Sequence, residues 1–228
     1  MPLTLIYWEV RRVKKPLTHR VHRFNNTAAI GIGSLIIFIA MIMVAGIAAS
    51  VLIQTMNVLE SQALTTGEET LRDISSGLRI NQVTGYYDSS TISQLAIFLR
   101  TTAGSSDVDL TYAYISLSDT STQVILNYTT NVFSSTVSGG LFGTLNSSNL
   151  AATTYGVMVI RDIDGSCVVA NPTINNDDLV VILVNTSKCF SGIGTRTEVF
   201  GTIVPEYGIR GVISFTTPSS YVDTIIDL

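Results

Sequence analysis

The chain has 228 residues, of which 46% are hydrophobic and only 13% are charged, and its formal net charge is −4. The first 28 residues hold six basic residues and one acidic residue, whereas the remaining 200 hold seven basic and sixteen acidic residues. This pattern excludes intrinsic disorder, because the apolar content is too high, and it argues against a nucleic-acid-binding protein, whose main domain would be basic.

The basic segment, residues 1–28, directly precedes an apolar run. Positive charge beside an apolar span stays on the cytoplasmic side of a membrane and sets the orientation of that span. We therefore expect residues 1–28 to be a leader and everything after the apolar run to be exported.

The apolar run covers residues 28–59, and no charged residue occurs between Arg23 and Glu60. It exceeds the roughly 20 residues needed to cross a bilayer and the roughly 7–15 apolar residues of a secretory signal, so we expect it to be retained. Helical spacing continues beyond it in Leu59, Ala63, Leu64, Leu71, Ile74 and Leu78. We predict one helix and assign it residues 29–80.

Residues 81–228 change to short β-branched runs separated by Gly, Asn, Ser and Asp, which predicts a β-sandwich. A strand is expected from Val108 to Tyr114, continuing after a bulge to Leu117. The other predicted strands are Gln94–Thr101, Gln123–Tyr128, Tyr155–Arg161, Leu179–Asn185, Thr197–Val204 and Gly211–Thr216.

The first half of the predicted helix is apolar on all sides, so it must be buried in lipid or in protein. Gly46 and Ser50 have the small-xxx-small spacing that permits close approach of two helices. One interpretation is a single-pass anchor with a stalk. The other is a subunit stored in the membrane whose helix later joins identical helices in a bundle, and the length of the helix favours it.

Three motifs closely resemble archaeal flagellins (archaellins), and they occur in the order found in that family. The first comprises Gly31 to Met41 and Val51 to Thr55, the second runs from Gly67 to Leu78, and the third comprises Val204-Pro205-Glu206-Tyr207-Gly208, Ile213 to Pro218 and Tyr221 to Thr224.

The resemblance implies an α+β fold, with the long helix in a filament core and an immunoglobulin-like antiparallel β-sandwich in the outer sheath. It implies a membrane-stored precursor with a class III signal peptide, cleaved by a prepilin-type peptidase. Assembly by a membrane platform with an ATPase would then give an extracellular archaeal flagellum for swimming. The expected partners are copies of the same chain and other archaellins, with no nucleic acid and no required cofactor. The residues expected to pack in the core are Gly31, Gly33, Leu35, Phe38, Ala45, Gly46, Ala49 and Ile53.

Alignment with the family places the signal-peptide cleavage between Ala28 and Ala29. Here the sequence departs from the family pattern, which usually has Gly at this point, closely preceded by Lys or Arg. In this chain Asn26 and Thr27 intervene, and the nearest basic residue is Arg23.

Asp162 and Asp164 are one residue apart just before Gly165, a spacing that lets carboxylate oxygens converge on Ca²⁺. Asp178 and its neighbours Asn175 to Asp177 could supply further oxygens. The alternative is a solvated acidic loop. Because some archaellins bind a metal ion in the outer domain, the resemblance adds support to a Ca²⁺ site.

Cys167 and Cys189 are the only cysteines, and an even number in an exported domain favours one disulfide. Two free thiols are the alternative. Asn127, Asn146 and Asn185 begin Asn-x-Ser/Thr patterns, so we expect them to be glycosylation acceptors.

Nothing in the sequence indicates a catalytic function. The two histidines, His19 and His22, lie in the leader, so no serine or cysteine of the remaining chain has a His to activate it. Two alternatives to a swimming filament remain open: an adhesion pilin with the same helix core, and a monomeric, uncleaved, membrane-anchored binding domain. An extracellular hydrolase is the least favoured.

Overall fold

The structure is a computed structural model and describes residues 26–228. The chain divides into two compact units, of which the first ends at Glu60 and the second is Ser61–Leu228, and each is considered by itself. Most of the predicted leader, residues 1–25, lies outside the described residues.

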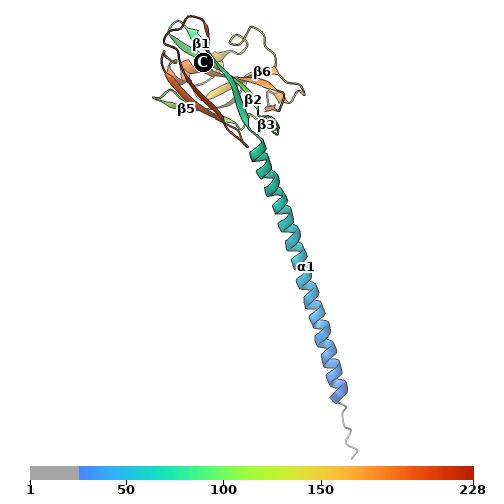
Figure 1. The fold of residues 1–228 in the computed structure, drawn as a ribbon. Coiled ribbons are helices and arrows are strands. Elements are labelled where there is room, and N and C mark those ends of the chain that lie inside the picture. Colours follow the sequence, from blue (N-terminus) through green and yellow to red (C-terminus); the bar gives the residue numbers. More distant parts are fainter. Residues whose placement is uncertain (1–25) are drawn as a thin grey trace, which may run out of the picture. The chain divides into compact units, whose positions relative to one another are not determined.

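Helix α1 (Asn26–Ser75) runs through 50 residues without interruption (Figure 1). Its last turn closes where the amide of Ser76 donates to the carbonyl of Arg72 at 2.9 Å. The prediction placed the helix end about five residues too late. Leu78 and Ile80 instead begin the first strand, and Leu78 packs in the core of the β domain with 3% of its surface exposed.

The second unit contains the C-terminal part of α1 (Ser61–Ser75), followed by strands joined by turns and two short helices. The strands are β1 (Leu78–Asp88), β2 (Thr91–Thr101), β3 (Val108–Asp109), β4 (Tyr114–Ser118), β5 (Gln123–Ser134), β6 (Thr154–Arg161), β7 (Cys167–Val168), β8 (Asn171–Ile174), β9 (Leu179–Asn185), β10 (Glu198–Val204), β11 (Gly211–Thr216) and β12 (Ile225–Asp227). The short helices are η1 (Ser147–Asn149) and α2 (Thr186–Phe190).

Nine strands form one sheet in the order β11-β10-β4-β5-β6-β9-β2-β1-β12, and β3, β8 and β7 form a small second sheet. All neighbouring strands are antiparallel except β5 and β6, which run parallel. The predicted fold class, a long apolar helix followed by a β domain, is confirmed. The parallel pair departs from the wholly antiparallel arrangement that was expected.

The nine-stranded sheet curls until its two ends meet beside the end of α1. Gly77 forms a β-bridge with Ile209. The amide of Ile209 donates to the carbonyl of Ser76, and the amide of Leu78 donates to the carbonyl of Ile209. The enclosed core contains side chains from both halves of the sheet, such as Ile182 of β9 and Ile213 of β11. One curled sheet thereby encloses the apolar core that two packed sheets enclose in a β-sandwich.

The strands β2, β6 and β9 are buried on both faces. A second apolar cluster, Ala96, Val132, Leu145, Leu150, Met158, Val181 and Leu183, covers the face that points away from the main core. This two-sided burial explains why these strands are continuous apolar runs in the sequence.

The predicted strand from Val108 to Leu117 is divided in the structure. Val108 belongs to β3 of the small sheet and Leu117 to β4 of the large one, with a turn between them. Leu110 and Ala113 in this turn are buried, and their carbonyls accept hydrogen bonds from the hydroxyl of Tyr155 at 2.8 and 3.0 Å. The alternation of apolar residues therefore reflects a buried turn. The prediction also missed β1, β7, β8 and β12.

Candidate functional site

Helix α1 exposes apolar side chains around its whole circumference from Ile30 onward. Leu35, Phe38 and Ile53 are each about 60% exposed (58%, 61% and 60%), and Ile39, the least exposed of the large apolar residues here, is still 49% exposed. Within the described residues this is the one helix long and apolar enough to cross a membrane, and none of its apolar window is buried. A surface of this kind requires lipid or protein around it.

The glycines in the apolar part of α1 lie at open positions within the described residues. A Cβ added at Gly31, Gly33 or Gly46 would meet no atom within 4 Å. Ala45 and Ala49 are also exposed. Because glycine weakens a helix by roughly 1 kcal/mol relative to alanine, its presence at open positions indicates a requirement imposed by something outside this chain.

The three predicted metal-binding carboxylates come together in the fold. Asp162, Asp164 and Asp178 each offer a carboxylate oxygen, and these oxygens lie within 4.8 Å of one another. Asp162 and Asp164 follow β6, and Asp178 immediately precedes β9, which is the antiparallel neighbour of β6. The pairing of these two strands therefore brings the two acidic loops to one end of the sheet.

Asp178 is 1% exposed, and backbone amides compensate for the burial of its charge. Its carboxylate accepts hydrogen bonds from the amides of Ile163 at 3.3 Å and Asn175 at 2.9 Å. Asp162 likewise accepts from the amides of Gly165 at 2.8 Å and Cys167 at 3.1 Å. These bonds hold both loops in place.

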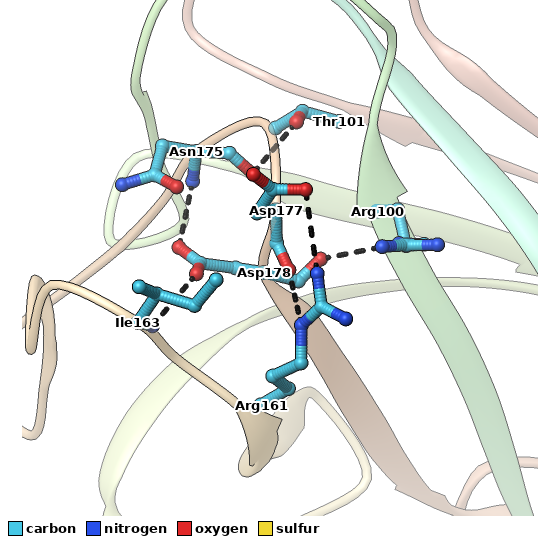
Figure 2. A network of polar contacts seen from close by, with 7 residues as sticks. All are labelled: Arg100, Thr101, Arg161, Ile163, Asn175, Asp177 and Asp178. Carbon is cyan, nitrogen blue, oxygen red and sulfur yellow. Dashed lines mark hydrogen bonds and ion pairs between the residues drawn. The ribbon is translucent and has the colours of Figure 1, made fainter.

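Two arginines fasten the loop that carries Asp178, as Figure 2 shows. Arg161 donates to the carbonyl of Asp177 at 2.8 Å and pairs with the Asp177 carboxylate at 3.3 Å, and Arg100 donates to the carbonyl of Asp178 at 3.4 Å. The hydroxyl of Thr101 adds a bond to the carbonyl of Asn175 at 2.8 Å. The loop is thus tied to both β2 and β6.

Asp164 is the exposed member of the three carboxylates. The hydroxyl and amide of Ser166 lower the pKa of Asp164, and the side-chain amide of Asn175 donates to its carboxylate at 2.5 Å. Asn175 therefore acts in this structure as a hydrogen-bond donor. The three clustered carboxylates offer oxygen ligands, without a neutral nitrogen or a sulfur among them. Such a donor set is suited to a hard cation such as Ca²⁺.

The predicted disulfide between Cys167 and Cys189 is not formed, because both cysteines are free thiols. Cys167 is buried on β7, whereas the thiol of Cys189 on α2 donates to the carbonyl of Ala152 at 3.2 Å. Burial, followed by the charges of Asp162 and Asp178, raises the pKa of Cys167 to about 12. Burial raises the pKa of Cys189 to about 11. The raised pKa values favour the neutral thiol form of both cysteines.

The three predicted glycosylation acceptors differ in exposure. Asn127 and Asn146 are exposed. Asn185 is 7% exposed, its amide nitrogen donates to the carbonyl of Ser147 at 2.9 Å, and its oxygen caps α2 by accepting from the amide of Lys188 at 3.2 Å. The burial and hydrogen bonds of Asn185 make it a poorer acceptor than the two exposed asparagines.

The junction between α1 and the strands contains interactions that the sequence did not indicate. The guanidinium group of Arg72 lies over the ring of Tyr207, and Gly208, with φ of +93°, lets the chain pass close to the carbonyl of Ser76. The third family motif contains Tyr207 and Gly208, but nothing in the sequence pairs that motif with the end of the helix.

Residues 28–215 of the chain match the family described as archaeal-type flagellin. Flagellin B2 of Methanocaldococcus jannaschii is 40% identical over 198 residues, which cover 86% of this chain and 91% of that protein. Flagellin B1 of Methanococcus voltae is 39% identical over 212 residues, which cover 90% and 96%.

Two solved structures resemble the fold. The crystal structure of archaeal flagellin FlaB1 from Methanocaldococcus jannaschii aligns with a TM-score of 0.61 at 37% identity and covers 67% of this chain and 96% of that one. The archaeal flagellum of Methanospirillum hungatei aligns with a TM-score of 0.60 over 84% of this chain and 95% of that one. At 13% identity the likeness is one of fold.

Proposed function

The chain belongs to the archaeal-type flagellin family and is a structural subunit that polymerises into an archaeal flagellum, and we propose that α1 supplies the contacts that hold this filament together. The observation that carries the proposal is the apolar circumference of α1, which no other part of the described chain covers. In water such a surface gains free energy only when other apolar surface covers it.

Identical helices of neighbouring subunits provide this cover in the proposed filament. Gly31, Gly33, Ala45, Gly46 and Ala49 allow helix backbones to approach closely. Leu35, Phe38 and Ile53 fill the space between helices. The β domain follows on the outside, where its acidic and polar surface faces water.

The subunit begins as a precursor held in the cell membrane by the same helix. The basic leader keeps the N-terminus on the cytoplasmic side, and a prepilin-type peptidase cuts between Ala28 and Ala29. A membrane platform with an ATPase then moves the helix from lipid into the growing filament, where apolar contacts replace those with lipid. Other archaellins can join the same polymer through equivalent helices.

The carboxylates of Asp162, Asp164 and Asp178 are proposed to hold a Ca²⁺ ion in the outer domain. Their oxygens lie within 4.8 Å of one another, which supports this assignment. An ion there would offset the mutual repulsion of three carboxylates and would join the loop after β6 to the loop before β9. Asn127 and Asn146, both exposed, are the proposed sugar acceptors.

Sheared cell-surface filaments test this function. We expect electron microscopy to show filaments whose mass spectrum contains this chain beginning at Ala29, and deletion of the gene should abolish both filaments and swimming. A chain that still begins at Met1 and remains membrane-bound without filaments would support an anchored binding domain. Filaments that persist while only surface adhesion is lost on deletion would support a pilin.

A further inference from the structure

Arg79 of β1 and Arg100 of β2 are direct cross-strand partners in the sheet. They line a cavity of about 450 Å³ together with Asn81, Thr101 and Asn176, and we name this feature the basic groove. Like charges directly opposite one another on neighbouring strands destabilise a sheet. Their pairing therefore calls for a negative group nearby.

The described residues do not supply that negative group. The one ion pair among residues 26–228 joins Arg161 to Asp177. Arg100 has a hydrogen bond only to a backbone carbonyl, that of Asp178 at 3.4 Å. Two of the seven basic residues that follow the leader thus meet in one groove of an otherwise acidic domain, and the groove is suited to a carboxylate.

A cavity of opposite charge lies beside the end of α1. It has a volume of about 520 Å³, and Asp107, Asp109 and Glu206 line it against a single basic residue, Arg72. We name this feature the acidic cavity. Its negative field is apparent at Tyr207, whose pKa is raised chiefly by Glu206. Arg72 is already engaged with the Tyr207 ring at 5.7 Å.

One residue that lines the acidic cavity carries a buried polar atom that lacks a partner. Ser76 is 1% exposed and lines the cavity, and its hydroxyl oxygen has no hydrogen-bond partner among the described residues. A buried hydroxyl without a partner costs roughly 1–3 kcal/mol. A guanidinium group entering the cavity would supply donors for its carboxylates.

The groove and the cavity share no lining residue, yet both lie where the β domain follows α1. The groove lies at the start of β1 and the end of β2, and the cavity lies beside the last turn of α1 and the loop after β10. Two different, complementary surfaces on one chain make a head-to-tail contact, which repeats into an open helical filament unless its rotation closes a ring.

We propose that in the filament the basic groove of one subunit docks against the acidic cavity of a neighbouring copy, with Arg79 facing Asp107 and Glu206. This inference rests on the proposed filament and adds an outer, electrostatic contact to the apolar helix core. The contact is directional, because the groove of one copy meets the cavity of the next.

Charge reversal in filaments tests the contact. In cells where the variant gene replaces the natural one, Arg79→Glu and Asp107→Arg should each make sheared filaments dissociate about 10-fold faster, because each places like charges in contact. The combined variant should return to within about 2-fold of the natural rate. Arg196→Glu is the matched control, since this arginine is exposed and lies outside both features.

Three results would overturn the contact: a combined variant that dissociates as fast as the single variants, Arg79→Glu filaments that match Arg196→Glu filaments, or Asp107→Arg filaments that match the natural ones. If Arg79→Glu gives no filaments at all, recovery of filaments in the combined variant supports the contact and failure to recover them refutes it. Stabilisation by inorganic phosphate together with no effect of Asp107→Arg would identify a free anion as the occupant. In every case the natural chain is the reference, and its failure to form filaments would reject the proposed function itself.

Discussion

The guanidinium carbon of Arg72 lies 5.7 Å from the centre of the Tyr207 ring. Arg72 belongs to the last turn of α1, and Tyr207 belongs to the loop between β10 and β11. A cation over an aromatic ring at this distance stabilises the pair by roughly 0.5–1 kcal/mol at an exposed site. The same loop bonds to Ser76 and Leu78 through Ile209. Three successive interactions thus join the end of the helix to the strands.

Gly208 makes this junction possible, and Gly208→Ala should destabilise the β domain by roughly 2–4 kcal/mol. Its φ is +93°, and an added Cβ would collide with the backbone carbonyl of Ser76. We expect thermal unfolding of sheared filaments, followed by circular dichroism, to show a melting temperature lower by roughly 5–15 °C.

Gly104→Ala is the control for this substitution. Its φ is +81°, but an added Cβ would meet no atom within 4 Å. It should therefore cost only the backbone term of roughly 1 kcal/mol. Equal losses at the two positions would show that contact with Ser76 is unimportant.

Asp164→Asn should remove the stabilisation that Ca²⁺ provides and little else. A ligand present at 100 times its Kd stabilises the folded state by about 2.7 kcal/mol, so the natural protein should melt at a higher temperature in calcium than in chelator. The variant should lose most of that difference. Asp164 is a better choice than Asp178, whose carboxylate also holds two backbone amides.

Asp88→Asn serves as the control, because this exposed acid is the last residue of β1 and is not one of the three clustered carboxylates. It should leave the response to calcium unchanged. A loss of melting temperature from Asp164→Asn that is the same in calcium and in chelator would count against the ion.

The two cysteines should react as protected, reduced thiols. At pH 8 the raised pKa values of about 12 for Cys167 and about 11 for Cys189 leave little thiolate, and burial further slows attack. We expect alkylation to be slow in intact filaments and to reach two groups per chain in denaturant without reductant. Two groups that appear only after reduction would reveal a disulfide. Cys189→Ser and Cys167→Ser assign each signal.

Gly46→Leu should weaken the filament although it strengthens the isolated helix. Leucine is a better helix former than glycine by roughly 0.5–1 kcal/mol, and none of the described residues lies within 4 Å of a Cβ added at Gly46. A lower dissociation temperature of the filament can then arise only from contact with another molecule. Gly67→Leu, equally open but in the charged part of α1, should have the smaller effect. A filament unchanged by Gly46→Leu would remove this glycine from the core.

Helix α1 was predictable because the interactions that form it join residues close together in the sequence. Hydrogen bonds in α1 join residues four apart, and an unbroken run of apolar residues therefore specified both the helix and its need for surrounding protein or lipid. Strands β2, β6 and β9 were also predicted, because each is a short apolar run between turn residues, whereas their burial on both faces emerged only from the fold. The convergence of Asp162, Asp164 and Asp178 was also expected, because two acidic loops flank strands that prove to be neighbours.

Other features depended on pairing between distant residues, and no local pattern contains that information. The end of α1 was misplaced because Leu78 and Ile80 fit a helical face as well as a strand, and only the core decided between them. Strand register brought Arg79 opposite Arg100, and packing separated Cys167 from Cys189 and buried Asn185. Local hydrogen bonding thus made the helix predictable from the sequence. Long-range packing determined where the helix ends and where the paired arginines and the two thiols of the β domain lie.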